Sequence, residues 1–134
     1  MQASVEYYEL CRQLGEAGLA VPWQEGQRVG RGYADLGIEE FLVLPGRRLV
    51  SLISGSGSEV PEGHERFFFW IPSVDECIDE IDRRGWDLLS ATFHERRTWH
   101  VQAIRNGVPL SGCAGSIEQA CAALLLAVLE RGDR

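Results

Sequence analysis

The sequence predicts an α+β fold in which helices pack on a twisted, mainly antiparallel sheet. Three observations predict it: an amphipathic helix after Pro72-Ser73, two runs of aromatic and β-branched residues behind it, and an apolar helix near the end of the chain. Together they make a helix, a three-stranded meander and a second helix, which fill the C-terminal half. The remaining residues are expected to be built onto this stretch.

The first of these helices is expected to run from about Val74 to Arg84. Ser73 is followed three residues later by Glu76, which is the spacing of a capping box at a helix N-terminus. Apolar residues then recur at helical spacing as far as Ile81, and the acidic residues, Glu80 among them, lie outside that stripe. A glycine follows Arg84 and supplies the left-handed residue that ends the helix.

Two strands are expected at Trp86–Phe93 and Thr98–Arg105, because both runs are rich in aromatic and β-branched residues. Asn106-Gly107 follows, and this dipeptide readily takes the two positive φ angles of a type I′ hairpin turn. A third strand after the turn would contain Pro109, which has no amide N–H to give to a ladder. That strand is therefore expected to be short or to lie at an edge.

The last helix is expected at Ile117–Arg131 and is apolar almost all round from Ala120 to Leu129. This apolar stretch is too short to span a bilayer, which takes about 20 residues. The helix is therefore either buried within its own fold or covered on its second face by another copy of the chain. A homo-oligomer formed through this helix is one of the two expectations.

The N-terminal half gives weaker signals. A helix is predicted over Val5–Ala17 and a short strand over Gln27–Tyr33. The turn signal Pro45-Gly46-Arg47 joins two β-prone runs into a hairpin, with strands at Phe41–Leu44 and Arg48–Ile53.

The segment between this hairpin and the C-terminal half is expected to hold a linker and one strand. Ser54–Gly63 is rich in glycine and serine and is predicted to be flexible, whereas Arg66–Ile71 is predicted to be a strand. The hairpin has too little apolar surface to stand alone, so it is expected to extend the same sheet. Residues 1–134 would then form a single domain, with residues 1–66 as an extension of a core at 67–131.

This succession of elements resembles the phage ABA-sandwich family of small viral proteins. The resemblance rests on Trp70 before Pro72-Ser73, the acidic helix, a hairpin that starts at Gly85-Trp86 and carries Trp99-His100-Val101, and the terminal alanine- and leucine-rich helix. It covers about residues 67–130. It implies a phage or prophage origin and a sheet flanked by helices, and it supplies no catalytic residues.

The resemblance also implies a class of function. Small phage proteins of this size often act on host defence, which favours a non-enzymatic accessory protein. The specific expectation is an anti-defence protein that sequesters a nucleotide-type immune signal, such as a cyclic or ADP-ribose-type nucleotide. The alternatives are an antagonist that blocks a host or defence protein, or a small phage protein with a structural or interaction role.

Charge and composition restrict the partners. A formal net charge of -7 argues against a nucleic-acid binder, whose affinity comes mainly from the neutralisation of phosphates. All thirteen basic residues are arginine. This fits either the codon usage of a GC-rich genome or a use for planar guanidinium groups that bind phosphate in two places at once.

The cysteines and the N-terminus indicate the compartment. The four cysteines, at positions 11, 77, 113 and 121, form no C-x-x-C pair and no zinc-like spacing with histidine. We expect reduced thiols in a protein of the host cytoplasm. The N-terminus has no basic stretch before an apolar core, so neither a signal peptide nor a membrane segment is expected.

No motif for catalysis, a metal or a cofactor is recognisable. Gly30-Arg31-Gly32 and Gly55-Ser56-Gly57 lack the residues that complete a phosphate-binding loop. The sequence has no G-x-S-x-G elbow for a serine nucleophile and no H-E-x-x-H metal motif. The protein is therefore expected to have no catalytic residues, no bound metal and no cofactor.

The candidate binding residues lie on and beside the meander. Because side chains alternate along a strand, His100 and Gln102 face away from the core if Trp99 faces it. Arginines at the neighbouring turn and at the far end could bind phosphate, and an aromatic ring could stack on a base. The predicted site residues are Arg96, Arg97, Trp99, His100, Gln102 and Arg105. The alternative is that they are ordinary solvated strand and turn residues.

The aromatic run Phe67-Phe68-Phe69-Trp70 is a second feature to place. Alternation puts Phe68 and Trp70 on the face opposite Phe67 and Phe69, so one of the two faces must be covered by a helix or a partner. The run fits a core strand or, alternatively, a binding platform.

Overall fold

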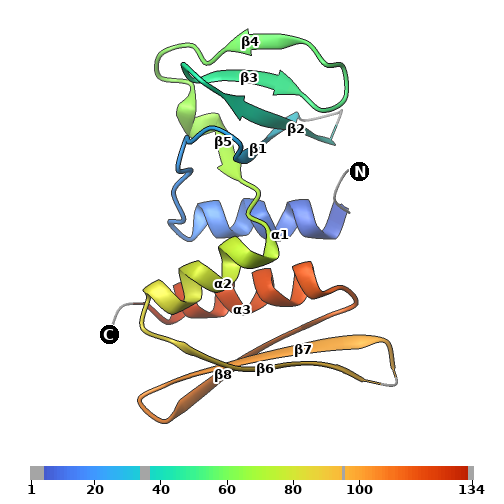
Figure 1. Ribbon diagram of the computed structural model, residues 1–134, viewed down its shortest axis with the longest axis vertical. Helices are drawn as coiled ribbons and strands as arrows, with labels where there is room; N and C mark the ends of the chain where they lie inside the picture. Colours follow the sequence, from blue (N-terminus) through green and yellow to red (C-terminus); the bar gives the residue numbers. More distant parts are fainter. Residues whose placement is uncertain (1–4, 34–36, 95, 133–134) are drawn as a thin grey trace. The chain divides into compact units, whose positions relative to one another are not determined.

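The computed structural model describes residues 5–33, 37–94 and 96–132 (Figure 1). Packing divides the chain into two compact units. The N-terminal unit holds the chain up to Gly15 together with Leu19–Ile71, and the C-terminal unit holds Glu16–Gly18 together with the chain from Pro72 onward. The sequence predicted a core that begins at residue 67, whereas the packing boundary lies slightly later, between Ile71 and Pro72.

The α+β fold class is confirmed: the described residues form three α-helices and two antiparallel sheets. The prediction that the N-terminal strands extend the sheet of the meander is wrong, because they form a separate five-stranded sheet. The aromatic run explains the separation. Phe68–Trp70 pairs with a strand of the N-terminal unit, and Pro72 then prevents the ladder from continuing toward the meander.

The described residues of the N-terminal unit form one helix, five strands and one 3₁₀ turn. In chain order these are α1 (Val5–Glu16), β1 (Arg28–Tyr33), β2 (Gly37–Leu44), β3 (Arg48–Ser51), β4 (Gly57–Glu59), the 3₁₀ turn (Glu65–Phe67) and β5 (Phe68–Trp70). The strands lie in the order β4-β3-β2-β1-β5, each antiparallel to its neighbours. The predicted first helix, first strand and hairpin are confirmed, with their ends shifted by a few residues.

A strand forms where the sequence predicted a flexible linker. β4 pairs with β3 although all three of its residues are exposed. Backbone hydrogen bonds alone can hold a short edge strand of glycine and serine, and they leave no apolar pattern that a reading of the sequence could detect.

The two faces of the five-stranded sheet differ. α1 lies against one face, where Cys11 and Leu14 are fully buried (Figure 1). Gly30 on that face leaves room for Phe69, because a β-carbon at Gly30 would lie 2.7 Å from the phenylalanine ring. The opposite face carries an apolar cluster made of Val29, Phe41, Val43 and Leu49, against which Val21, Trp23, Val60 and Phe68 pack.

The C-terminal unit contains the predicted helix, meander and helix. These are α2 (Val74–Arg83), β6 (Asp87–His94), β7 (Thr98–Arg105), β8 (Val108–Ala114) and α3 (Ile117–Arg131). The strand order is β6-β7-β8, so the strand that contains Pro109 lies at an edge, as predicted. Asn106 (φ 52°) and Gly107 (φ 77°) both have positive φ at the β7–β8 turn, which confirms the expected backbone of the hairpin.

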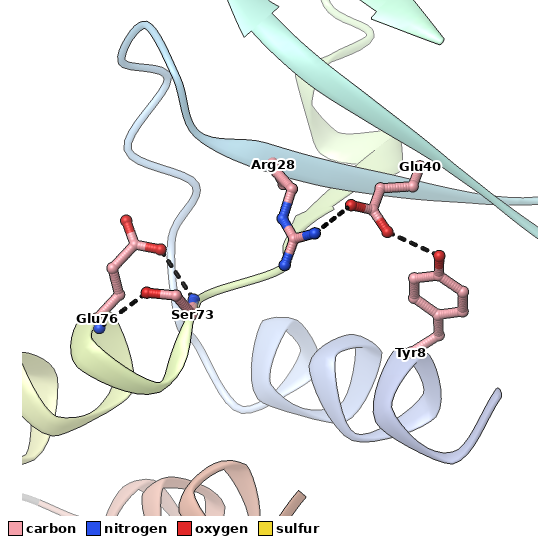
Figure 2. Close-up of polar contacts among 5 residues, drawn as sticks. All are labelled: Tyr8, Arg28, Glu40, Ser73 and Glu76. Atoms are coloured by element: carbon pink, nitrogen blue, oxygen red, sulfur yellow. Dashed lines mark hydrogen bonds and ion pairs between the residues drawn. The ribbon is translucent and has the colours of Figure 1, made fainter. Parts of the chain in front are cut away.

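The start and end of α2 follow the sequence signals closely. The Ser73 side chain accepts a hydrogen bond from the Glu76 amide at 3.2 Å, and the Glu76 carboxylate accepts one from the Ser73 amide at 2.8 Å (Figure 2). Gly85 takes a positive φ of 86° after the helix. One expectation fails: Glu80 is buried and not exposed. Arg83 and Arg84 of the same helix pair with its carboxylate, which offsets the cost of burying the charge.

α3 packs closely on the meander and on α2. A β-carbon on Gly112 of β8 would lie 2.3 Å from the carbonyl oxygen of Ala120 and 2.5 Å from the amide nitrogen of Leu124, so only glycine allows this approach. Leu124 and Leu125 are fully buried. An oligomer formed through this helix stays a prediction.

Candidate functional site

The meander presents one polar face. Val101 and Ala103 of β7 are fully buried beneath the helices, whereas Gln102 between them is exposed, which shows the alternation along the strand. The register places Thr92 of β6 and Cys113 of β8 directly across from His100. We call this surface the open face. It consists of Thr92, His94, Thr98, His100, Gln102, Ser111 and Cys113.

Four side chains of the open face contact one another and form what we call the imidazole–thiol cluster: Thr92, His94, His100 and Cys113. The Cys113 sulfur lies 3.1 Å from Nδ1 of His100, and the Thr92 hydroxyl lies 3.1 Å from Nε2 of His94. The two imidazole rings meet edge to face with their centroids 4.4 Å apart. The cluster thus places a thiol, a hydroxyl and two titratable rings together at the surface.

The structure brings together some of the predicted site residues. His100 and Gln102 share the open face, and Arg96 and Arg97 are exposed at the adjoining β6–β7 turn. Arg97 has a positive φ of 56°, and the Thr98 hydroxyl donates to the Arg96 carbonyl at 3.3 Å. This part of the turn is therefore held in a defined conformation beside the open face.

Two predicted residues lie elsewhere. Trp99 and Arg105 alternate with His100 and Gln102, so they belong to the face that the helices cover. Trp99 packs beside Phe93, with ring centroids 5.3 Å apart. Arg105 donates to the carbonyl of Arg84 at 3.4 Å, close to the end of α2. Neither residue can join the open face as an aromatic or a cationic partner.

A second candidate surface lies in the N-terminal unit and was not predicted. We call it the arginine–aromatic surface. It consists of Arg31, Tyr33, His64, Arg66, Phe67 and Phe68. It forms because β1 pairs with β5 in a register that sets Arg31 opposite Phe68. The guanidinium carbon of Arg31 lies 5.3 Å from the ring centroid of Tyr33, 5.4 Å from that of Phe67 and 5.8 Å from that of Phe68.

The segment before β5 completes this surface. Arg66 places its guanidinium carbon 4.7 Å from the Phe67 ring centroid, and the His64 ring meets the same phenylalanine edge to face at 5.3 Å. Phe67 remains 42% exposed, so solvent can reach its ring. Two cations and an imidazole therefore surround an aromatic ring that solvent can reach.

Acidic residues border the arginine–aromatic surface. The pKa of Tyr33 is raised, first by burial and then by the negative charge of Glu39. Glu39 also accepts a 2.6 Å hydrogen bond from the Ser51 hydroxyl. Glu65 forms an ion pair with Arg47 at 2.9 Å. Each of these carboxylates thus has a partner within the fold.

The sequence contained only part of the signal for this surface. The sequence predicts that Gly30-Arg31-Gly32 is not a phosphate-binding loop and that the aromatic run is either a core strand or a binding platform. Both features contribute, but only the antiparallel pairing of β1 with β5 puts them side by side. Strand pairing between distant segments cannot be read from either segment alone.

A third polar group lies beneath α1 and is buried. The Tyr8 hydroxyl donates a 2.7 Å hydrogen bond to Oε1 of Glu40, whose side chain is fully buried (Figure 2). Nη1 of Arg28 lies 3.0 Å from Oε2 in an ion pair, although its N–H is not directed well enough to count as a hydrogen bond. Electrostatic attraction to Arg28, and not a hydrogen bond, therefore offsets the cost of burying the second carboxylate oxygen.

The thiol of Cys11 lies near this buried pair. Its pKa is raised to about 12, chiefly by burial. A hydrogen bond with Tyr7 lowers the pKa, the negative charge of Glu40 raises it, and the positive charge of Arg28 lowers it. The thiol is accordingly held in its neutral form. Tyr8, Glu40 and Arg28 connect α1 to the sheet, and we assign them to stability rather than to ligand binding.

In residues 5–33, 37–94 and 96–132, no group of three or more histidine, cysteine, aspartate or glutamate side chains is arranged to hold a metal ion. None of the helices in those ranges combines the length and the apolar composition that crossing a membrane requires.

Comparisons with known proteins found no match among protein families, curated proteins or solved structures. The resemblance to the phage ABA-sandwich family therefore stays a prediction.

Proposed function

We propose that this protein is a non-enzymatic binding protein that holds a phosphate-bearing small molecule of the nucleotide class. The observation that carries the proposal is the arginine–aromatic surface, where Arg31 and Arg66 flank the exposed ring of Phe67. Together with the resemblance described above, it supports a phage anti-defence protein that sequesters a nucleotide-type immune signal.

The chemistry of this surface suits such a ligand. A guanidinium group offers parallel N–H donors that bind two phosphate oxygens at once. An exposed aromatic ring can stack on a nucleobase, which contributes about 1–3 kcal/mol per base at single-stranded nucleic-acid sites. Phe67 supplies the ring, and Arg31 and Arg66 approach it from β1 and from the segment before β5.

The overall charge favours a small ligand over a nucleic-acid chain. With a net charge of -7, the protein repels a long polyanion, whose binding needs many phosphate contacts along a basic surface. A compact ligand needs only the few cations that lie together here. Arg66 is exposed and its guanidinium carbon lies 4.7 Å from the Phe67 ring centroid, so the guanidinium can turn toward a phosphate beside that ring.

A thermal-shift screen tests this proposal. The purified protein is heated with cyclic mono-, di- and trinucleotides and with ADP-ribose derivatives, one class at a time. A ligand that binds only the native state stabilises it by RT ln(1 + [L]/Kd), about 2.7 kcal/mol at a hundredfold excess over Kd. We expect an increase in Tm with one class of ligand and recovery of that ligand unhydrolysed after incubation.

Two pairs of variants locate the site. Arg31→Gln with Arg66→Ala removes the cations of the arginine–aromatic surface, and Arg96→Ala with Arg97→Ala removes those beside the open face. The first pair should abolish the Tm increase, and the second should leave it intact. Loss of the increase only in the second pair would place the ligand at the sequence-predicted residues and contradict the site proposed here. No increase with any ligand would contradict nucleotide binding itself.

A protein partner is the second candidate, and one observation favours it. β6 is an edge strand, and it carries three exposed apolar side chains: Leu88, Leu89 and Phe93. An edge strand with exposed apolar residues can pair with a strand of another protein. We infer that the protein would then act as an antagonist, with the host or defence protein that it blocks docked on β6.

Capture from a host lysate separates the two candidates. The native protein should retain a specific host protein that Leu89→Lys fails to retain. Leu52→Lys is the matched control, because Leu52 is also exposed but belongs to the N-terminal unit. Equal capture by native protein and Leu89→Lys would contradict docking on β6.

A further inference from the structure

The imidazole–thiol cluster has a feature that the proposed binding function does not use. Cys113 of β8 and His100 of β7 are directly paired across the sheet, and their side chains meet with the sulfur 3.1 Å from Nδ1. In the tautomer that carries its proton on Nε2, His100 accepts a hydrogen bond from the thiol. A thiol within hydrogen-bonding reach of an imidazole is the arrangement in which a base activates a sulfur nucleophile.

The strands hold this pair in place. His100 lies on the central strand, which pairs with β6 on one side and with β8 on the other, so the backbone around it is fixed. The ring of His94 contacts the His100 ring at 4.4 Å, and His94 is itself bonded to Thr92. The imidazole therefore has Cys113 on one side and a second ring on the other, which restricts its rotation.

Exposure separates Cys113 from the other cysteines. All four cysteines of the chain lie in the described ranges, and Cys113 is the exposed one, whereas Cys11, Cys77 and Cys121 are buried. Burial raises the pKa of Cys11 to about 12 and that of Cys121 to about 11, which keeps both thiols neutral. A reagent in solution can reach only Cys113 without opening the fold.

We propose that Cys113 is a reactive thiol, with His100 as its proton acceptor, and that it forms mixed disulfides with low-molecular-weight disulfides. The open face is thereby a site of reversible covalent modification. This inference does not rest on nucleotide binding, because the arginine–aromatic surface belongs to the other unit and shares no residue with the cluster.

The exchange is balanced without any further reactant. His100 takes the thiol proton, and the Cys113 sulfur attacks one sulfur of the disulfide RSSR. The S–S bond of the reagent breaks as the new S–S bond forms, and RS⁻ leaves. The imidazolium returns its proton to RS⁻, so the products are the Cys113 mixed disulfide and one RSH. A second thiol molecule reverses the step.

Titration with an aromatic disulfide that releases a coloured thiolate, 5,5′-dithiobis(2-nitrobenzoate), tests the proposal. The native protein should release one equivalent rapidly, and mass spectrometry of a digest should place the adduct on Cys113. Cys113→Ser should lose this phase. His100→Gln should react about tenfold more slowly near pH 7, because an unassisted thiol is only a few per cent thiolate at that pH.

Two further measurements complete the test. Ser111→Ala, at an exposed residue two positions before Cys113 on β8, is the matched control and should react at the native rate. In native protein, Cys113 should also react about tenfold faster than the cysteines of the same chain unfolded in urea, a comparison that needs no variant. Equal rates for His100→Gln and native protein, a fast phase that survives Cys113→Ser, or a native rate no greater than the unfolded one would each overturn the proposal.

Discussion

The hydroxyl of Tyr8 and the carboxylate of Glu40 meet at 2.7 Å, with the carboxylate fully buried under α1 (Figure 2). Arg28 supplies the opposite charge, with its Nη1 at 3.0 Å from the second oxygen. A buried carboxylate is costly unless charge and hydrogen bonds offset the loss of water. Each of the two partners is therefore expected to matter more than a surface contact of the same length.

Tyr8→Phe tests the hydrogen bond. The substitution keeps the ring but leaves Oε1 of Glu40 without the phenolic donor, so the free energy of unfolding should fall by about 1–3 kcal/mol. Urea unfolding followed by circular dichroism measures this fall. The slope with respect to urea should stay constant, which would show that only stability has changed.

An exposed contact of equal length is the control. Arg12 and Glu9 form an ion pair at 2.7 Å on the outer part of α1, where both side chains are about half exposed. Glu9→Gln should change the free energy of unfolding by less than about 1 kcal/mol. Equal effects of Tyr8→Phe and Glu9→Gln would show that burial of Glu40 does not strengthen the contact.

Alkaline pH should destabilise the protein through its buried thiols. The ordinary cysteine pKa of 9.0 is raised to about 12 at Cys11 and to about 11 at Cys121, chiefly by burial. Above pH 9 the unfolded chain loses protons that the folded chain keeps, so the unfolded state gains stability. The free energy of unfolding should fall by about 1.4 kcal/mol per pH unit for each thiol as pH rises toward the folded pKa.

Urea unfolding at about pH 8 and about pH 10 measures this dependence. Cys11→Ala should lose stability at both pH values because a buried group is removed, but its stability should fall less steeply between them. Keeping pH at or below about 10 limits the contribution of Tyr33, whose raised pKa acts in the same direction. If the free energy of unfolding fell as steeply with pH in Cys11→Ala as in native protein, Cys11 would be excluded as a source of the pH dependence.

The C-terminal unit could be predicted because its signals are local. The capping box, the helical spacing of apolar residues and the Asn106-Gly107 turn each lie within a few residues, and each is confirmed. Alternation along a single strand was also enough to place His100 and Gln102 on one face. The same rule puts Trp99 and Arg105 on the other face, away from the arginines of the turn.

The N-terminal unit was harder to predict because its organisation depends on pairing between distant segments. The arginine–aromatic surface requires Arg31 to meet Phe68 across two strands. The burial of Glu40 requires a tyrosine from α1 and an arginine from β1, and neither partner is adjacent to it in sequence. β4 has no apolar side chains at all, so only its backbone pairing reveals it.

Ser73→Ala tests the capping box of α2. The change removes the oxygen that accepts from the Glu76 amide, so the free energy of unfolding should fall by about 0.5–2 kcal/mol. Ser58→Ala is the control, since Ser58 is exposed in β4 and should change stability by no more than about 0.5 kcal/mol. Thermal unfolding of the two variants side by side measures the difference, and identical Tm values would show that the cap contributes nothing.

Gly112→Ala tests the contact between β8 and α3. The new β-carbon would lie 2.3 Å from the carbonyl oxygen of Ala120 and 2.5 Å from the amide nitrogen of Leu124. Backbone atoms cannot move aside as a flexible side chain can, so the strand and the helix must separate. We expect the free energy of unfolding to fall by about 3 kcal/mol, the upper part of the range for overpacked sites.

Gly115→Ala is the matched control for this contact. A β-carbon there would meet no atom within 4 Å, so this substitution adds the same methyl group to the same segment without the collision. It should leave the free energy of unfolding within about 0.5 kcal/mol of the native value. Urea unfolding of both variants separates a steric effect from a general cost of replacing glycine. If both lost stability equally, close packing of β8 on α3 would not be the cause.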